Sequence, residues 1–249
     1  MKKTYKYRIH LSKKQLASAN CILSSCRYVY NYLLNYRNTK YKNTKQSTSN
    51  YEQNKLITTL KENNKHLKQV HSQTLQNVSK RLDLAFAAFF RRLKVYLQAM
   101  KEGKQAEKPG FPRFKGKDHY HSFTYPQYYT SFKLRQIANK TKIYIPKIGY
   151  VNIKLHRPIL GDVKQAIVKR TPTNKWYIYI ICDNVPKVNL PKTNNEVGLD
   201  LGLKTYATLS DNSKIKNPRF YKHEQKKLAK VQRRLSKSKK DKNKYIKTK

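Results

Sequence analysis

Acidic residues are scarce in this chain of 249 residues, which has 13 Asp and Glu against 56 Lys and Arg. An AT-rich genome favours lysine, asparagine and tyrosine, so abundant lysine alone indicates little. The same genome should also supply Asp and Glu, so genome composition does not explain the scarcity of acidic residues. The formal net charge of +43 opposes a compact state unless a polyanion neutralises it. An anionic membrane could do so, but the 20 tyrosines suit bases that stack on aromatic rings. The composition therefore predicts a nucleic-acid partner.

Long apolar runs and paired cysteines are also missing. No run approaches the roughly 20 apolar residues of a membrane-spanning helix, and no signal-peptide core follows the opening MKK. We therefore expect no membrane partner, and a prokaryotic cytoplasmic protein associated with the nucleoid. Cys21, Cys26 and Cys182 are odd in number and form no C-x-x-C pair, which argues against a disulfide framework or a zinc ribbon. With 38% apolar residues the chain can still bury a core.

The first hundred residues predict one strand followed by three helices. Tyr5, Tyr7 and Ile9 alternate with polar neighbours, as in a half-buried strand. Ser12 and Gln15 have capping-box spacing, and apolar residues at steps of three and four then predict a helix to about Arg37. After a polar loop over 38–48, caps at Ser49 and Ser72 predict helices that end near residues 64 and 100. The last helix has a basic side opposite its apolar stripe, formed by Lys80, Arg81, Arg91, Arg92 and Lys94.

The second part of the chain reads as strands. Glycines and prolines mark 101–117 as a loop, and period-two patterns from about Tyr120 to Asp183 predict several antiparallel strands, one of them reaching Leu155, with a hairpin turn at 171–174. The first strand, the helical insertion and these later strands fit one β module resembling a small barrel. The predicted class is α+β, and a Pro/Asn/Lys-rich connector over 184–195 separates this module from the rest.

Residues 196–215, EVGLDLGLKTYATLSDNSKI, contain the sharpest motif. Asp200 is predicted in a strand, opposite the apolar side chains and between Gly198 and Gly202. A metal ion and a phosphate backbone can approach such a carboxylate closely, as on the first strand of the ribonuclease-H-like fold. One Asp cannot complete a two-metal site. Two alternatives are a polar residue beside a turn, and the phosphate strand of actin-like ATPases; the latter needs a second Gly-rich loop, whereas no glycine follows Gly202.

Six segments in the expected order resemble the TnpB family of transposon-encoded proteins, also called OrfB-type transposases. They are MKKTYKYRIHLSKKQ (1–15), CRYVYNYLL (26–34), GFPRFK (110–115), LHRPI (155–159), VGLDLGLKTYATLSD (197–211), and NPRF (217–220) with the basic helix after it. The resemblance implies a guide RNA derived from a transposon end, a DNA target, and cleavage at three acids with Mg²⁺, of which Asp200 matches the first. LHRPI is expected within a strand.

The resemblance also implies a division into domains. Residues 1–11 and 101–195 would form a β-barrel-like wedge domain, and 12–100 a helical recognition insertion. Residues 196–249 would form the first strands and the basic helix of a RuvC-type nuclease domain. The family's remaining Glu and Asp, and its four-cysteine zinc finger, lie downstream of the position that matches Lys249.

We therefore expect a C-terminally truncated, cleavage-deficient member of the family, without its zinc finger and without productively bound Mg²⁺. Of the later acids, Asp211 fits a turn, Glu224 the first turn of the basic helix, and Asp241 a lysine-rich end. The apolar stripe of that helix (Leu228, Val231 and Leu235) is expected to be exposed. The alternatives are a nuclease-dead repressor or accessory protein, and a general RNA-binding protein.

Arginine grips phosphates with two parallel hydrogen bonds, so arginine pairs and the loop cations are the predicted nucleic-acid contacts. They are Arg91 and Arg92 on the third helix, Arg113 and Lys115 in the GFPRFK loop, and Arg233 and Arg234 near the end.

Overall fold

The computed structural model describes residues 1–137, 140–187, 191, 193 and 196–238. The chain divides into two compact units, Met1–Pro186 and Lys187–Lys249. The connector predicted over 184–195 lies partly outside the described residues, and Asp241 lies wholly outside them.

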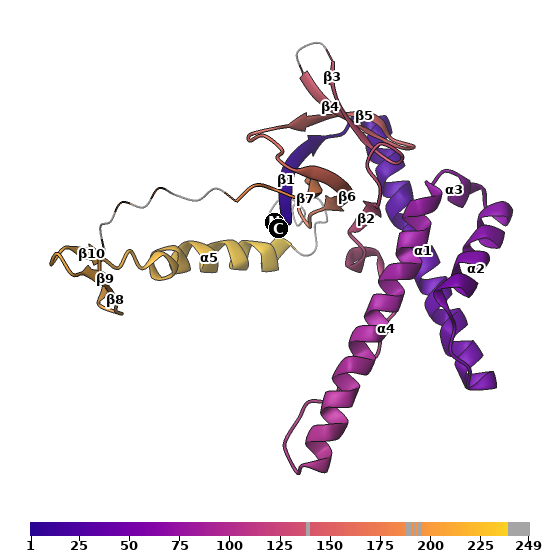
Figure 1. Cartoon of the computed structure of the whole chain (residues 1–249), viewed down its shortest axis with the longest axis horizontal. Coiled ribbons are helices and arrows are strands. Elements are labelled where there is room, and N and C mark those ends of the chain that lie inside the picture. Colours follow the sequence, from indigo (N-terminus) through magenta and orange to yellow (C-terminus); the bar gives the residue numbers. More distant parts are fainter. Residues whose placement is uncertain (138–139, 188–190, 192, 194–195, 239–249) are drawn as a thin grey trace. The chain divides into compact units, whose positions relative to one another are not determined.

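The first unit contains a curled, seven-stranded antiparallel sheet in the order β2-β6-β7-β1-β5-β4-β3, which forms a half-barrel (Figure 1). The N-terminal strand lies at its centre, paired with β7 on one side and β5 on the other. The strands are β1 (Lys3–His10), β2 (Ser122–Tyr125), β3 (Lys133–Ile137), β4 (Lys140–Ile145), β5 (Gly149–Lys154), β6 (Asp162–Arg170) and β7 (Trp176–Asp183). The α+β class is confirmed; the barrel is open, with β2 and β3 at its edges.

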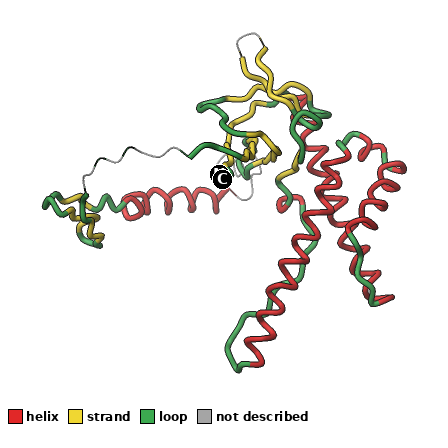
Figure 2. The backbone as a smooth tube through the Cα atoms, viewed as in Figure 1, coloured by secondary structure: helices red, strands yellow, loops and turns green. Residues whose placement is uncertain are grey.

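The helices of the first unit lie between β1 and β2 in the sequence, and Figure 2 shows them in red beside the yellow strands of the sheet. They are α1 (Lys13–Thr44), α2 (Asn50–Asn63), the single turn α3 (Lys65–Lys68) and α4 (Ser72–Lys101), followed by the 3₁₀ turn η1 (Lys117–His119). The capping box of Ser12 and Gln15 is confirmed in both directions. Ser49 caps α2 through the Glu52 N–H, while the Glu52 carboxylate bonds instead to Tyr36 and Lys40 of α1.

Three boundaries differ from the predictions. Helix α1 continues to Thr44 through the segment predicted as a loop, because Lys40 is held by Glu52 of α2, and Arg37 by Asp83 of α4. Ser72 is the first residue of α4, whose N-cap is His71 without a side-chain cap bond. Strand β5 ends at Lys154, so LHRPI is a loop; there the Arg157 carbonyl accepts a hydrogen bond from the Tyr7 hydroxyl.

One hydrophobic core joins the inner face of the half-barrel to α1 and the first half of α4. Alternate residues of the strands enter it, among them Tyr5, Tyr7 and Ile9 of β1, as period-two alternation requires. The stripe of α1 is buried at Ala19, Leu23, Cys26, Tyr30 and Leu33, while Leu16 is exposed. The stripe of α4 is buried only as far as Leu82. The face of the sheet away from the helices is therefore free to carry polar residues.

The second unit contains a three-stranded antiparallel meander, β8 (Leu199–Leu201), β9 (Thr205–Leu209) and β10 (Lys214–Lys216), and the helix α5 (Phe220–Lys237). Leu199, Leu201 and Leu203 are exposed, and so are Leu228 and Val231 of α5. The expected exposure of the apolar stripe is confirmed for these two residues of α5; Leu235 is half-buried. The structure shows this meander without a hydrophobic core of its own beyond Ala207.

Candidate nucleic-acid interface

The outer face of the seven-stranded sheet combines basic and aromatic side chains in rows across several strands. Arg8 of β1 pairs with Tyr177 of β7 and Lys154 of β5, and Tyr177 pairs in turn with Lys169 of β6. A parallel row runs through His10, Asn152, Lys142 and Arg135. Tyr150, Tyr144 and Lys133 form a third row towards β3. We call the face made by these three rows the outer face. Its three rows, as the structure describes them, contain no acidic side chain.

Cations and tyrosine rings contact one another on this face. The Lys6 ammonium lies 4.5 Å from the centroid of the Tyr177 ring, and the Arg8 guanidinium 5.9 Å from it. The buried Arg8 Nε has no hydrogen-bond partner within the described part of the chain. Arg8, Lys154, Tyr177 and Arg157 also border an open hollow of about 550 Å³. An anion here would give Arg8 an acceptor, and the tyrosine ring offers a base a surface to stack on.

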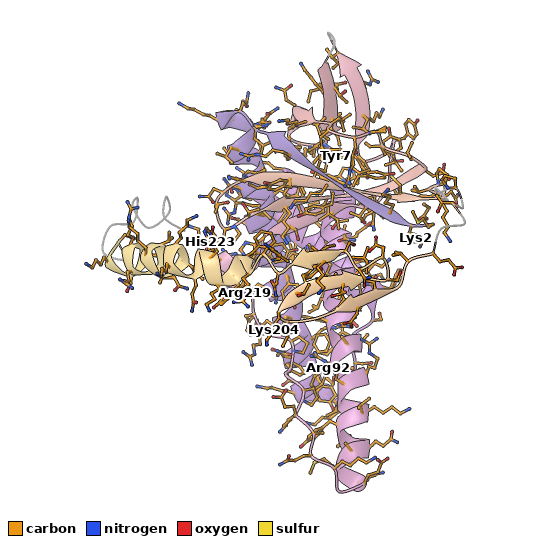
Figure 3. All side chains as sticks on the ribbon, turned by 90° about the vertical axis from the view of Figure 1, so that its left-hand side faces the viewer. Lys2, Tyr7, Arg92, Lys204, Arg219 and His223 are labelled. Carbon is orange, nitrogen blue, oxygen red and sulfur yellow. The ribbon has the colours of Figure 1, made fainter. Side chains whose placement is uncertain are left out.

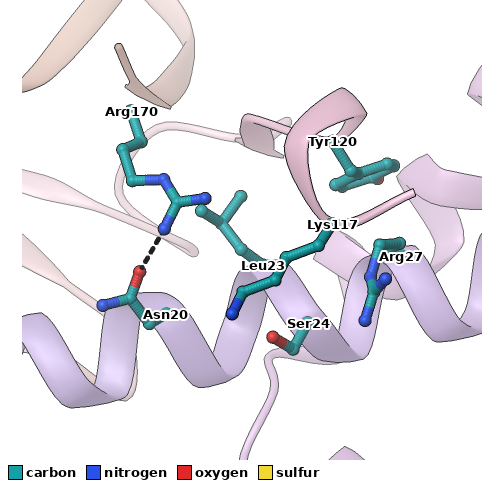
Figure 4. A pocket seen from close by; sticks show the side chains of 7 residues that line it. All are labelled: Asn20, Leu23, Ser24, Arg27, Lys117, Tyr120 and Arg170. Carbon is teal, nitrogen blue, oxygen red and sulfur yellow. Dashed lines mark hydrogen bonds between the residues drawn. The ribbon is translucent and has the colours of Figure 1, made fainter. Parts of the chain in front are cut away.

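A second group of cations borders a hollow of about 370 Å³ between α1 and the sheet. Arg27 of α1, Lys117 of η1 and Arg170 at the end of β6 converge there, with Asn20 and Ser24 beside them (Figure 4). Arg170 donates to the Asn20 amide oxygen at 3.0 Å, which orients its guanidinium. Tyr120 forms part of the wall, and burial raises the pKa of its hydroxyl above the ordinary range, so it remains a neutral donor. This cation pocket suits a phosphate group.

The structure brings two of the predicted contacts together and separates the others. Arg91 and Arg92 are exposed on α4 and border a groove of about 510 Å³, whose opposite wall includes Lys108 of the 102–116 loop. Figure 3 shows Arg92 on the part of α4 remote from the sheet. Arg113 is exposed, while Lys115 is half-buried and held to α1, since Asn31 bonds both its N–H and its carbonyl. Arg233 and Arg234 are exposed on α5, in the second unit.

Sequence reasoning missed the outer face as a unit, and it misassigned one cation. Lys6 and Arg8 were visible as the polar side of an alternating strand, but their neighbours Tyr177 and Lys154 come from strands far away in the sequence. Arg81, predicted on the basic side of α4, points inward instead. Its guanidinium donates to the Ser122 carbonyl at 2.7 Å and to the Tyr120 hydroxyl, so it joins α4 to the sheet.

The geometry around Asp200 explains the glycine beyond it. Asp200 is exposed on β8 and pairs with Thr208 of β9. At Gly202 a Cβ would lie 3.0 Å from the Thr205 carbonyl oxygen, so the tight turn after the strand favours a residue without a side chain. Asn217 of the NPRF segment donates to the Leu203 carbonyl at 3.0 Å, which ties that motif to the same turn.

The residues present do not fit a magnesium site. The side chain of Ser213 and then its backbone N–H lower the pKa of the Asp211 carboxyl, and Glu224 is paired with Lys227 and His223. Across the described ranges, no three His, Cys, Asp or Glu side chains are grouped closely enough to hold a metal ion. No helix in the same part of the chain is long and apolar enough to cross a bilayer.

Comparison with known proteins agrees with this arrangement of motifs. A family model described as "Probable transposase", of OrfB type, matches residues 179–249, and a "Helix-turn-helix domain" model of the same group matches residues 1–46. Residues 1–46 fold here as the strand β1 and the single continuous helix α1. The OrfB-type matches thus lie at both ends of the chain.

Two curated relatives match almost the whole chain. One is "Putative RNA-guided DNA endonuclease InsQ" of Escherichia coli (strain K12), 29% identical over 250 residues, which cover 98% of this chain and 56% of that protein. The other is "Putative RNA-guided DNA endonuclease" of Streptomyces pristinaespiralis, 26% identical over 241 residues, or 95% of this chain and 55% of that protein. The chain thus spans about half the length of these relatives. The family models and the relatives together show that the chain is similar to OrfB-type transposon-encoded proteins.

Proposed function

We propose that these 249 residues form the nucleic-acid-binding part of an RNA-guided DNA endonuclease, and that the outer face binds the RNA backbone. The observation that carries the proposal is the row Lys169–Tyr177–Arg8–Lys154, in which three cations flank one aromatic ring across four strands. Cations neutralise phosphates without reading sequence, while the ring can stack on a base. The names of both relatives support RNA and DNA as the partners.

The partners in this proposal are a guide RNA derived from a transposon end and a DNA target paired with it. Residues 1–11 and 101–195, which include the strands of the half-barrel, would be the wedge domain, and residues 12–100, which include the helices α1 to α4, the recognition lobe. Residues 196–249 would supply the start of a RuvC-type nuclease, with Asp200 as its first acid. The exposure of Asp200 on β8 and the tight turn at Gly202 support this assignment.

We further propose that the 249-residue chain binds nucleic acid without cutting it. Two-metal cleavage of a phosphodiester uses several carboxylates to hold two ions about 4 Å apart. Asp211 and Glu224 are engaged with Ser213 and Lys227, which leaves Asp200 as the carboxylate available on the meander. Guide-dependent binding without cleavage would suit a repressor or an accessory subunit.

The test is to incubate the full chain with the RNA encoded at the end of its own transposon, and with bulk cellular RNA as competitor. Selective retention of the transposon-end RNA, together with intact DNA target in Mg²⁺, is the expected result. Equal affinity for both RNAs would favour a general RNA-binding protein. DNA cutting by the wild-type chain that is lost in Asp200→Ala would refute the proposed cleavage deficiency.

A further inference from the structure

An aromatic cavity of about 600 Å³ opens between the C-terminal part of α1, the second half of α4 and the 102–116 loop. Four phenylalanines form its walls. The Phe111 ring lies edge-on to Phe86 and Phe89, with centroids 5.4 and 5.1 Å away, and Phe90 lies edge-on to Phe89 at 5.3 Å. Phe90 and Phe111 are 57% and 47% exposed. Such a cluster of exposed rings marks an interaction site, and the volume lies within the usual range of ligand pockets.

Two residues that border this cavity contain buried polar atoms without a hydrogen-bond partner in the described part of the chain. Thr48 borders the cavity and is 7% exposed, and its Oγ1 has no hydrogen-bond partner among the described residues. The same holds for Nη1 of Arg37, whose Nη2 is fixed by Asp83 and by the Thr48 carbonyl. An unpaired buried polar group is costly. The cavity therefore combines aromatic walls with two bordering residues that each contain a buried, unpaired polar atom.

We propose that this cavity takes one unstacked nucleobase of a single-stranded segment. A base is flat enough to stack on phenyl rings, and its edge carries acceptors and donors for the Thr48 hydroxyl and the Arg37 Nη1 once these buried atoms turn towards it. An aliphatic side chain of a protein partner would fill the cavity but leave both groups unpaired. The proposal rests on the proposed function, because it deepens the same nucleic-acid binding.

The charges around the cavity favour the same occupant. Lys42 and Tyr41 stand exposed at its rim. The groove bordered by Arg91, Arg92 and Lys108 is formed by residues next to those of the cavity in the sequence. Arg91 of the groove follows Phe90 of the cavity, and Gly110 of the groove precedes Phe111 of the cavity. A strand whose base enters the cavity would therefore have cations available for its phosphates. A neutral apolar peptide would gain nothing from them.

The experiment uses the full chain and short single-stranded RNAs in which one position carries 2-aminopurine or, alternatively, an abasic linker. The fluorescence of 2-aminopurine rises when the base leaves its stack, so binding to the wild type should raise it. Phe111→Ala should weaken binding of the base-carrying RNA about tenfold, the effect of losing a stacking partner, and should abolish the fluorescence rise. The abasic RNA should bind both proteins equally.

Phe114→Ala is the matched control, because Phe114 lies in the same loop, is 55% exposed and does not border the cavity. It should behave as the wild type. Thr48→Val keeps the side-chain shape without the hydroxyl and should weaken only the base-carrying RNA. If Phe111→Ala and Phe114→Ala bind alike, or if the abasic RNA binds the wild type as tightly as the base-carrying RNA, the base-binding proposal is wrong; a site for a protein segment would give that result.

A further variant separates this proposal from the proposed function. Arg8→Gln with Lys154→Gln, on the outer face, should weaken the base-carrying and the abasic RNA by the same factor. If this double variant binds both RNAs as the wild type does, while Phe111→Ala still abolishes the difference in affinity between base-carrying and abasic RNA, the outer face is refuted as a binding surface and the base-binding cavity is supported. Failure of the wild type to bind any single strand would refute both proposals.

Discussion

Replacing Arg8 and Lys154 together should remove two phosphate contacts from the outer face. The two residues are direct cross-strand neighbours on β1 and β5, and among the described residues neither forms an ion pair with an acid. Each phosphate contact contributes about 0.7 to the slope of log K against log salt for a single strand. The Arg8→Gln/Lys154→Gln variant should therefore have a slope shallower by about 1.4. If the variant and the wild type bind equally at 1 M salt, this difference in slope makes the variant bind about 25-fold more weakly than the wild type at 0.1 M salt.

The assay is a salt titration of RNA binding, with fluorescence of Trp176 as the check on folding. Trp176 is the single tryptophan of the chain and is buried on β7, so its emission reports on the half-barrel. Lys65→Gln/Lys68→Gln on α3 removes the same charge away from the outer face and should leave the slope within about 0.3 of the wild type. Equal changes in both double variants would refute the outer face as the binding surface, because net charge alone would explain them.

Three further predictions concern folding and the GFPRFK loop. Burial, and then Lys61 and Lys147, lower the pKa of His71 below its ordinary value of 6.5 in the folded protein. The stability that this shift contributes is present above about pH 6.5 and is lost as the pH falls below it. The free energy of unfolding, measured by Trp176 fluorescence, should therefore fall more between about pH 7 and 5 in the wild type than in His71→Phe. Asn31→Ala removes both hydrogen bonds to the Lys115 backbone and should speed tryptic cleavage at Arg113 and Lys115, whereas Asn35→Ala on the exposed side of α1 should not. Leu33→Ala, fully buried, should cost about 2–5 kcal/mol of unfolding free energy by urea titration, against about 0.5 kcal/mol or less for the exposed Leu97→Ala; equal costs would contradict the core assignment.

Periodicity predicted most elements of the first unit because burial on one face leaves a regular mark on the sequence. The alternation around Tyr5 and Tyr7, the capping box of Ser12 and the hairpin turn near Asn174 all depend on neighbours within a few residues. The prediction that α1 ends near Arg37 was wrong for the opposite reason. Its polar last turns are held by Glu52 and Asp83, which belong to other helices, and local composition does not contain that information.

The candidate interface shows the same division. Arginine pairs such as Arg91 and Arg92 can be selected from sequence, and the groove with Lys108 keeps them together. The sequence alone did not show that Arg81 would turn inward to Ser122, or that Lys115 would be held by Asn31. Charge in a sequence indicates a polyanionic partner, but only packing decides which cations are used internally.

The sequence by itself determined the charge, the α+β class, the order of the motifs and the resemblance to OrfB-type proteins, because these follow from composition, local periodicity and similarity along the chain. The tertiary structure alone decided which residues become neighbours. Antiparallel pairing brings Arg8, Tyr177, Lys154 and Lys169 into one row, and the packing of α1 against α4 and Phe111 creates the aromatic cavity. The physical reason is that strand register and helix packing minimise the free energy of the whole chain, so contacts between distant residues leave no local mark in the sequence.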